Sequence, residues 1–249
     1  MENWLKQATD KPLYPDVIWS KPENKNGAGK LLIIGGSAGN FAHVAKSYSQ
    51  AEQAGAGTIH LLVPDSLRAV TKQIPFINYA PSNPSGGFAK QALAEVLETA
   101  KNVDGALLAG DMGKNSETTL MLEELVNKVD ITLFIAPEAI ESFTNFESLL
   151  VGKNIVLCLT QNQLRDLFIE TKSETAITSG LQKPNLAKAL REFSQKNLAT
   201  LIIEFNGDIW LANNGNVVES VNNFSPAKSA VWAIQQPEKP LQSLVSSLC

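Results

Sequence analysis

Three turns in this sequence could bring backbone amides and polar side chains to a small-molecule ligand. The first, Gly35–Asn40, has the sequence GGSAGN and follows a short apolar run. The second, Gly110–Gly113, reads GDMG, and the third leads into Ser225. Glycine lets a backbone approach a ligand closely, and amides at a helix start can bind an anion. Either glycine segment could instead be a tight turn that needs glycine only for its conformation.

Several residues in and near the first two turns are therefore candidates for ligand binding. His43 could face the ligand or make a polar contact at the start of a helix. Asp111 is framed by glycines and could accept a proton, although most carboxylates at strand ends cap helices or lie at the surface. The full set of candidates is Gly35, Gly36, Ser37, Asn40, His43, Gly110, Asp111 and Gly113.

Composition argues against several other classes of function. The chain has 249 residues, with 21 basic and 25 acidic residues and a formal charge of −4. Both signs are spread along the chain, so we expect no surface that displaces counterions from a nucleic acid. The cysteines and histidines are too few for a zinc cluster, and we assign no metal-binding residue: they are Cys158, Cys249, His43 and His60.

The same observations lead to an expectation about location. The longest apolar runs, such as Leu31–Ile34 and Ile155–Leu159, are much shorter than the roughly 20 residues that span a bilayer. The first residues, MENWLKQATD, show no basic-then-apolar signal segment. The positions of the two cysteines suggest no disulfide bridge, which suits a reducing compartment. We expect a cytoplasmic protein that does not associate with membranes.

Apolar runs of strand type alternate with helical patterns through most of the chain. Each run is short and almost continuously apolar, as expected for a parallel strand covered by helices on both faces. The predicted strands are Lys30–Ile34, Thr58–Val63, Gly105–Ala109, Ile131–Ala136 and Asn154–Thr160. The predicted helices are Ala42–Ala54, Gly87–Lys101, Ser116–Lys128, Glu138–Leu150 and Gln161–Glu170. This series predicts a three-layer α/β/α fold with a mostly parallel sheet.

The C-terminal third has a different pattern. Strand-like runs at Thr200–Phe205, Asp208–Ala212 and Asn216–Val221 are separated by Asn-Gly turns, which are typical of hairpins. We therefore expect an antiparallel C-terminal flank on the sheet, followed by a helix that starts at Ser225. No linker divides the chain, so residues 1–249 are predicted to form one domain, with residues 1–29 as an N-terminal arm.

One segment also resembles a known family. The sequence NGAGKLLIIGGS, from Asn26 to Ser37, is followed by GAG at Gly55–Gly57. This arrangement resembles the opening of the ADP/ATP-dependent NAD(P)H-hydrate dehydratases, which belong to the ribokinase-like superfamily. Gly110–Gly113 is similar to the GPGLG loop of that family, and Ile135–Ile140 stands in the place of its LDADAL segment. The resemblance extends from Lys25 to about Leu167.

The resemblance implies a ribokinase-like fold and a role in metabolite repair. In that family, ADP or ATP with Mg²⁺ phosphorylates the hydroxyl of hydrated NAD(P)H, and elimination restores the dihydronicotinamide. A Gly-x-Gly-Asp motif at a helix start supplies the base and an amide pocket for the developing charge. The implied ligand of this chain is therefore an NAD(P)-like or nucleotide small molecule.

The sequence departs from the family at the residues that carry this chemistry. The helix that should open with Gly-Thr-Gly-Asp begins with SPAK, which places Lys228 at the position of the aspartate. An ammonium group cannot accept a proton unless burial lowers its pKa by several units. Glu204 stands where the family has a lysine that contacts phosphate, and it would repel that phosphate. We expect Glu204, Ala227 and Lys228 to mark an altered nucleotide side, and Glu204 to form an ion pair with Lys228.

Three functions remain open at this point. The first is a dehydratase-like protein whose degraded motif leaves weak catalysis or ligand binding alone. The second is a working enzyme in which Asp111 replaces the missing base. The third is a non-catalytic structural or partner subunit with a closed crevice. We also expect a homo-oligomer, because one helical face of the tail could cover either this core or a neighbour; it carries Leu241, Leu244, Val245 and Leu248.

Overall fold

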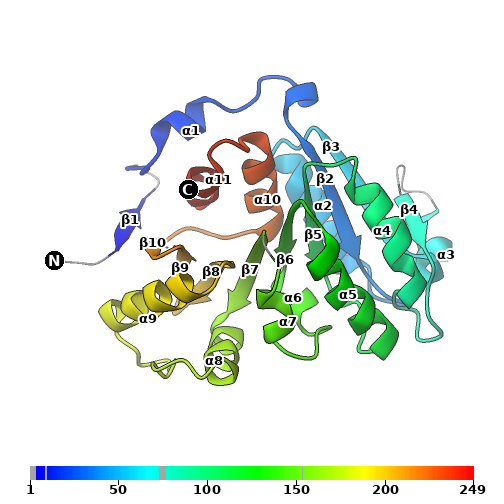
Figure 1. Cartoon of the computed structure of the whole chain (residues 1–249). Helices are drawn as coiled ribbons and strands as arrows, with labels where there is room; N and C mark the ends of the chain where they lie inside the picture. Colours follow the sequence, from blue (N-terminus) through cyan, green and yellow to red (C-terminus); the bar gives the residue numbers. More distant parts are fainter. Residues whose placement is uncertain (1–3, 9, 73–76, 153) are drawn as a thin grey trace.

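A single mixed sheet runs through the computed structural model, which describes residues 4–8, 10–72, 77–152 and 154–249. Within these residues the strand order is β1-β10-β9-β8-β7-β6-β5-β2-β3-β4 (Figure 1). The strands are β1 Leu5–Gln7, β2 Lys30–Gly35, β3 Thr58–Pro64, β4 Ile77–Ala80, β5 Gly105–Ala109, β6 Thr132–Ile135, β7 Ile155–Thr160, β8 Thr200–Phe205, β9 Asp208–Asn213 and β10 Asn216–Ser220.

The sheet has a parallel centre and an antiparallel flank, as the sequence predicts. The strands from β4 across to β8 pair in parallel, whereas β9 runs antiparallel to both β8 and β10. Each of the eight predicted strands is confirmed to within one residue at either end. Strands β1 and β4 were not predicted, because both are short and carry little apolar signal.

Helices cover both faces of the sheet. They are α1 Pro15–Trp19, α2 Ala42–Gln53, α3 Arg68–Thr71, α4 Leu93–Ala100, α5 Ser116–Lys128, α6 Pro137–Ile140, α7 Glu147–Leu150, α8 Gln161–Glu170, α9 Lys183–Lys196, α10 Pro226–Gln235 and α11 Pro240–Ser247. Short 3₁₀ helices lie at Lys25–Gly27, Asp65–Leu67 and Lys90–Ala92. Neither α1 nor α9 was predicted.

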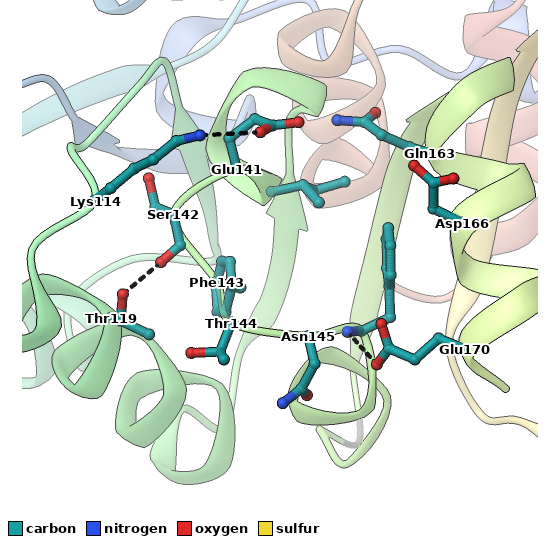
Figure 2. Close-up of a pocket in the computed structure, with 12 residues that line it drawn as sticks. Lys114, Thr119, Glu141, Ser142, Phe143, Thr144, Asn145, Gln163, Asp166 and Glu170 are labelled. Atoms are coloured by element: carbon teal, nitrogen blue, oxygen red, sulfur yellow. Dashed lines mark hydrogen bonds and ion pairs between the residues drawn. The ribbon is translucent and has the colours of Figure 1, made fainter.

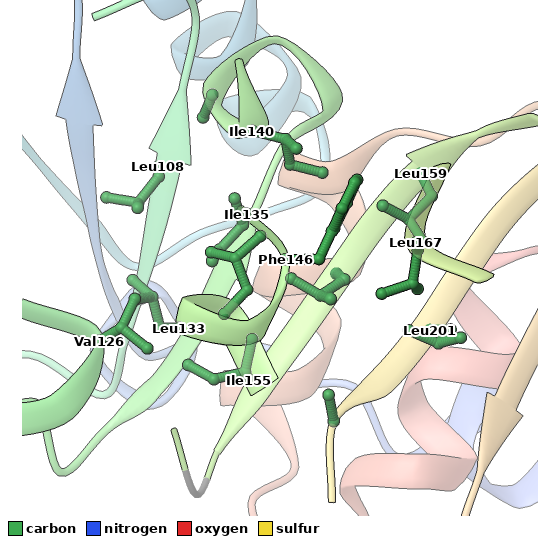
Figure 3. Close-up of a cluster of buried hydrophobic side chains, with 14 of the residues drawn as sticks. Leu108, Val126, Leu133, Ile135, Ile140, Phe146, Ile155, Leu159, Leu167 and Leu201 are labelled. Atoms are coloured by element: carbon green, nitrogen blue, oxygen red, sulfur yellow. The ribbon is translucent and has the colours of Figure 1, made fainter. Parts of the chain in front are cut away.

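Alternation along the strands divides the core into two layers. On one face, Leu108 and Ile135 pack with buried residues of α4, α5, α7, α8 and α9 (Figure 3). On the other face, Leu107 and Phe134 pack with buried residues of α2, α10 and α11. Because neighbouring strand residues point to opposite faces, a continuously apolar strand can supply both layers.

The helix predicted over Glu138–Leu150 is wrong as a single element. The chain forms α6 and α7 with a turn between them, because polar side chains cap a new helix start there. The Glu170 carboxylate accepts hydrogen bonds from the amides of Phe146 and Glu147, at 2.7 and 3.1 Å. Asn145 Oδ1 accepts from the amide of Ser148 at 3.0 Å.

The apolar face of the tail covers the core of its own chain. Leu244, Val245 and Leu248 are at most 4% exposed and belong to the layer with α2 and α10, and Leu241 packs against it. The N-terminal arm is also held, since β1 pairs in parallel with β10. Residues 1–3 and 9 of the predicted arm lie outside the described residues.

Candidate functional site

The strand order places the topological switch point of the sheet between β2 and β5. From β2 the chain continues outward through β3 and β4, whereas from β5 it continues the other way through β6, β7 and β8. The helices that follow, α2 and α5, therefore lie on opposite faces of the sheet. Ligands of open α/β sheets bind outside the carboxyl ends of strands at such points.

The two glycine-containing turns meet at this switch point. Ser37 Oγ donates to the carbonyl oxygen of Asp111 at 3.3 Å, and Asn40 Nδ2 donates to Asp111 Oδ2 at 3.4 Å. The other carboxylate oxygen, Oδ1, accepts from the amide of Gly113 at 2.8 Å. We call the assembled residues the switch-point cluster: Gly35, Gly36, Ser37, Asn40, His43, Gly110, Asp111, Gly113 and Glu138.

Glycine is required at two positions of the cluster. A Cβ atom on Gly35 would lie 1.8 Å from the carbonyl oxygen of Ala109 on the neighbouring strand. Gly110 has a φ of +79°, and a Cβ atom there would lie 3.0 Å from the Cβ of His43. Strands β2 and β5 can therefore end side by side only because neither residue has a side chain.

Most amides of the first turn are already engaged, which limits their use for an anion. The amide of Ser37 donates to the carbonyl of Asn40 at 3.2 Å, and the amide of Asn40 returns a bond of 2.8 Å. The amide of Ala38 donates to Gly86 at 2.9 Å. The turn thus holds its own shape, and an amide cradle for an anion is not available at these three positions.

Sequence analysis missed a partner for His43. In the structure, His43 Nδ1 lies 3.3 Å from Glu138 Oε1, and the two side chains are 45% and 41% exposed. Glu138 comes from the first turn of α6, which follows β6, the strand next to β5. Because parallel neighbours end at the same edge of a sheet, a carboxylate directly after β6 could have been assigned to this site.

A polar cleft of about 440 Å³ adjoins the cluster (Figure 2). It begins at Lys114, directly after Gly113, and continues along α6 and α8 to Gln163 and Glu170. Gln163 Nε2 donates to the carbonyl of Pro137 at 2.8 Å, which ties α8 to the start of α6. The cleft therefore begins next to the cluster along the chain, after Gly113 and after Glu138 of α6.

The altered nucleotide side does not contain the expected ion pair. Glu204 lies at the carboxyl end of β8, beside a hollow shared with Thr160, Gln161, Asn162, Asn206 and Gly207. Lys228 instead donates to the main-chain oxygen of Cys249 at 2.7 Å, and its amine lies 5.7 Å from the centre of the Trp232 ring. The predicted Glu204–Lys228 pair is therefore wrong.

The start of α10 is enclosed by other parts of the chain. Ser225 caps the helix, since its hydroxyl accepts from the amide of Lys228 at 3.2 Å, and the same hydroxyl donates to Gln50 near the end of α2. Ala227 is fully buried. The amine of Lys21 lies 3.5 Å above the ring of Trp232. The N-terminal arm and the residues after α11 thus lie against the part of α10 where the resemblance places the catalytic aspartate, the base of that family.

Burial shifts the pKa of several side chains. It lowers the pKa of Lys228, and burial together with the charge of Lys228 lowers the pKa of Lys21. Burial, and then the charge of Glu138, raises the pKa of the Cys158 thiol. Cys158 is therefore a packed, protonated thiol in β7.

The described residues lack two further features. No group of three or more histidine, cysteine, aspartate or glutamate side chains in them is arranged to hold a metal ion. None of the helices they form is long and apolar enough to cross a membrane.

The cluster and its fold can be compared with known proteins. No protein-family model matches the chain. A bifunctional NAD(P)H-hydrate repair enzyme of Moorella thermoacetica is 25% identical over 136 residues, covering 53% of this chain and 26% of that enzyme. The enzyme of the same name from Dictyoglomus turgidum is 26% identical over 154 residues, covering 59% of this chain and 30% of that enzyme. The chain thus matches less than a third of the length of each relative.

Solved structures agree over nearly the whole chain. A ribokinase-like superfamily protein of Enterococcus faecalis superposes with a TM-score of 0.69 at 13% identity, covering 97% of this chain and 84% of that chain. The fold is ribokinase-like. The ADP/ATP-dependent NAD(P)H-hydrate dehydratase of Bacillus subtilis, co-crystallised with ATP and Mg²⁺, superposes with a TM-score of 0.57 at 11% identity, covering 96% and 86%.

The predicted ribokinase-like α/β/α fold and the resemblance to hydrate dehydratases are therefore confirmed. The site assignments remain predictions, although the eight candidate ligand-binding residues do lie at one edge of the ribokinase-like sheet. Glu204, Ala227 and Lys228 do not join them as a unit.

Proposed function

We propose that this ribokinase-like chain binds an NAD(P)-like or nucleotide small molecule at the switch-point cluster and the adjoining cleft, without efficient nucleotide-dependent dehydration. The observation that carries the proposal is the position of Lys228. Its amine donates to the main-chain oxygen of Cys249 and stands where the resemblance places the aspartate base, so the start of α10 offers no proton acceptor. The similarity to hydrate repair enzymes supports the class of ligand.

The residues on the nucleotide side do not fit the phosphates of ATP. The hollow beside Glu204 is lined by one carboxylate and neutral groups, with no lysine or arginine among its lining residues. Phosphates are normally held by cationic side chains or by free amides at a helix start. We therefore assign no phosphoryl transfer step to this chain.

The two other functions are weaker on specific grounds. As a substitute base, Asp111 has both carboxylate oxygens engaged, by Asn40 and by the amide of Gly113. A closed scaffold or partner subunit is disfavoured because His43 and Glu138 are each more than 40% exposed at the cluster. Ligand binding with little or no dehydration therefore accounts for more of the geometry.

Two measurements test the proposed function. Wild-type protein incubated with hydrated NADH and ADP or ATP should show little recovery of dihydronicotinamide absorbance, and rapid recovery would contradict the loss of catalysis. Thermal denaturation with AMP, ADP, ATP, NAD and NADP should show stabilisation by at least one compound. A ligand at 100 times its Kd adds about 2.7 kcal/mol to the free energy of unfolding.

The Asp111→Asn variant distinguishes an enzyme that uses Asp111 as its base from a protein that binds its ligand without efficient dehydration. If Asp111 were a substitute base, Asp111→Asn would abolish any residual turnover while leaving ligand binding intact. Under the proposed function the variant leaves the already low turnover unchanged.

A further inference from the structure

His43 and Glu138 form a pair that the hydrate-dehydratase resemblance does not account for. His43 lies in the first turn of α2, and Glu138 lies in the first turn of α6. Their side chains meet at 3.3 Å through Nδ1 of the imidazole and Oε1 of the carboxylate. A carboxylate on one ring nitrogen orients the imidazole and directs the other nitrogen outward.

The second nitrogen of His43 is available to a ligand. Among the described residues, Nε2 has no hydrogen-bond partner, and 45% of the side chain is exposed. Gly110 backs the ring, because any side chain there would meet the Cβ of His43 at 3.0 Å. The ring is therefore held at Nδ1 by Glu138, while the base of the side chain lies close to Gly110, and Nε2 remains as its free polar atom among the described residues.

The surroundings of this nitrogen suit a hydroxyl group. The Glu138 carboxylate contacts the ring directly, and the Asp111 carboxylate is bonded to Asn40 and to the amide of Gly113. The nearest cation along the chain is the exposed Lys46, one helical turn further along α2. The amides of Ser37, Ala38 and Asn40 are engaged within the protein. Because Nδ1 faces the Glu138 carboxylate and donates to it, Nε2 is the acceptor nitrogen of the ring, and a ligand hydroxyl would meet an acceptor there.

We propose that His43 Nε2 accepts a hydrogen bond from a hydroxyl group of the ligand, and that Glu138 positions His43 for this contact. The part of the ligand at the cluster is then a neutral, hydroxyl-bearing ring such as a sugar. This assignment rests on the proposed function for the existence of a ligand. The accessibility of His43 does not depend on it.

Chemical modification tests the pair without a ligand. Diethyl pyrocarbonate acylates neutral imidazole nitrogens, and this chain has only two histidines. Wild-type protein should show one fast and one slow histidine, with the fast phase missing in His43→Gln and retained in His60→Gln. Glu138→Ala should slow the fast phase, and Glu138→Gln should largely restore it, because its amide oxygen can still accept from Nδ1–H. A His43 that reacts no faster than His60 overturns the proposal.

Binding measurements test the class of ligand. Adenosine and hydrated NADH should protect His43 from modification, whereas inorganic pyrophosphate should not. Replacing His43 by Ala should weaken adenosine or hydrate binding about tenfold, equivalent to about 1.4 kcal/mol, and His60→Ala should leave it unchanged. Equal affinity of wild type and His43→Ala, or protection by pyrophosphate alone, overturns the proposal. Wild type that binds none of these compounds contradicts the proposed function, and the modification rates then decide the inference alone.

Discussion

The polar groups of the switch-point cluster and those at the start of α10 differ in what surrounds them. In the cluster, His43 and Glu138 pair with each other and remain more than 40% exposed. At the start of α10, the amine of Lys228 is bonded to Cys249, and its pKa is lowered by burial. A ribokinase-like sheet can therefore leave the candidate site at β2 and β5 open while other parts of the chain pack against the start of α10.

The covering has a simple cause in the chain path. Only residues 221–225 connect β10 to α10, so the helix starts close to the sheet and beside α2. The arm then reaches the helix through Lys21, and α11 reaches it through Cys249. The carboxyl ends of β2 and β5 are contacted by the loop around Gly86 instead. Its Gly86 carbonyl accepts from the amide of Ala38, and its Ser85 hydroxyl accepts from Asn115. His43 and Glu138 nevertheless remain more than 40% exposed.

The largest effect is expected at Gly35, where the end of β2 lies against β5 in the switch-point cluster. Gly35→Ala would place a Cβ 1.8 Å from the carbonyl oxygen of Ala109, so β2 and β5 would have to separate. We expect a loss of about 4 kcal/mol or more in the free energy of unfolding, or failure to fold, measured by urea denaturation. Gly180→Ala is the matched control, because a Cβ there meets nothing within 4 Å and its φ is not positive. Equal stability of the two variants would show that β2 and β5 can separate at Gly35 without cost.

The next largest effect is expected on the covered side, where the arm is held to the sheet. Glu219 is 5% exposed; its carboxylate accepts from Trp4 Nε1 at 2.6 Å and from Lys183 Nζ at 2.5 Å. Glu219→Ala leaves the partly buried indole donor of Trp4 without its partner, and we expect a loss of about 1 to 2 kcal/mol, measured by urea denaturation. Lys183→Met should cost less, because Lys183 is half exposed. If Glu219→Ala has no effect, the arm does not depend on this contact.

The fold could be predicted well because its strands carry a strong local signal. Runs such as β5 and β8 are apolar on both faces and bounded by turn residues, and their predicted ends are correct. The arm, in contrast, forms β1 only by pairing with β10, a contact about 210 residues away in the chain. Helix α9 was missed even though its apolar residues are regularly spaced, including Leu186, Leu190 and Phe193.

The candidate site could be predicted only in part, because only some of its residues carry a local signal in the sequence. Glycines such as Gly35 and Gly110 report a local need for close backbone approach, and both lie where they were expected. The partner of Lys228 depended on where the tail returns, which no local pattern encodes, so Glu204 was assigned instead of Cys249. Glu138 was missed because its relation to His43 appears only once β6 is known to lie beside β5.

A smaller effect is expected from pH at the two covered lysines. Burial lowers the pKa of Lys228, and burial together with Lys228 lowers that of Lys21, so between these lowered values and 10.5 the unfolded chain binds more protons than the folded one. The free energy of unfolding therefore gains a contribution that increases as pH rises through this range. Lys228→Met removes one of these two lysines, and it also removes the positive charge that contributes to the lowered pKa of Lys21. Its stability relative to wild type should therefore fall as pH rises towards 10.5.

Urea denaturation at several pH values measures this slope. Lys188→Met is the matched control, because Lys188 is a lysine with a 72% exposed side chain on α9. A difference between Lys228→Met and wild type that stays constant with pH would show that the amine is as solvated as that of Lys188. The contrast between the covered and the open region would then rest on geometry alone.

The smallest effect on stability is expected at the rim between the cluster and the cleft. Lys114 Nζ and Glu141 Oε2 are 3.7 Å apart, and their side chains are 76% and 58% exposed. An exposed pair of this kind contributes about 0 to 0.5 kcal/mol, so Glu141→Gln should leave the urea midpoint almost unchanged. Lys114 is the one cation among the residues that line the cleft, and this variant frees it from Glu141. Binding of ADP relative to adenosine should therefore improve in this variant, and the gain should disappear at high salt because the charges are exposed. If ADP binding does not change, the charged end of the ligand does not extend into this cleft.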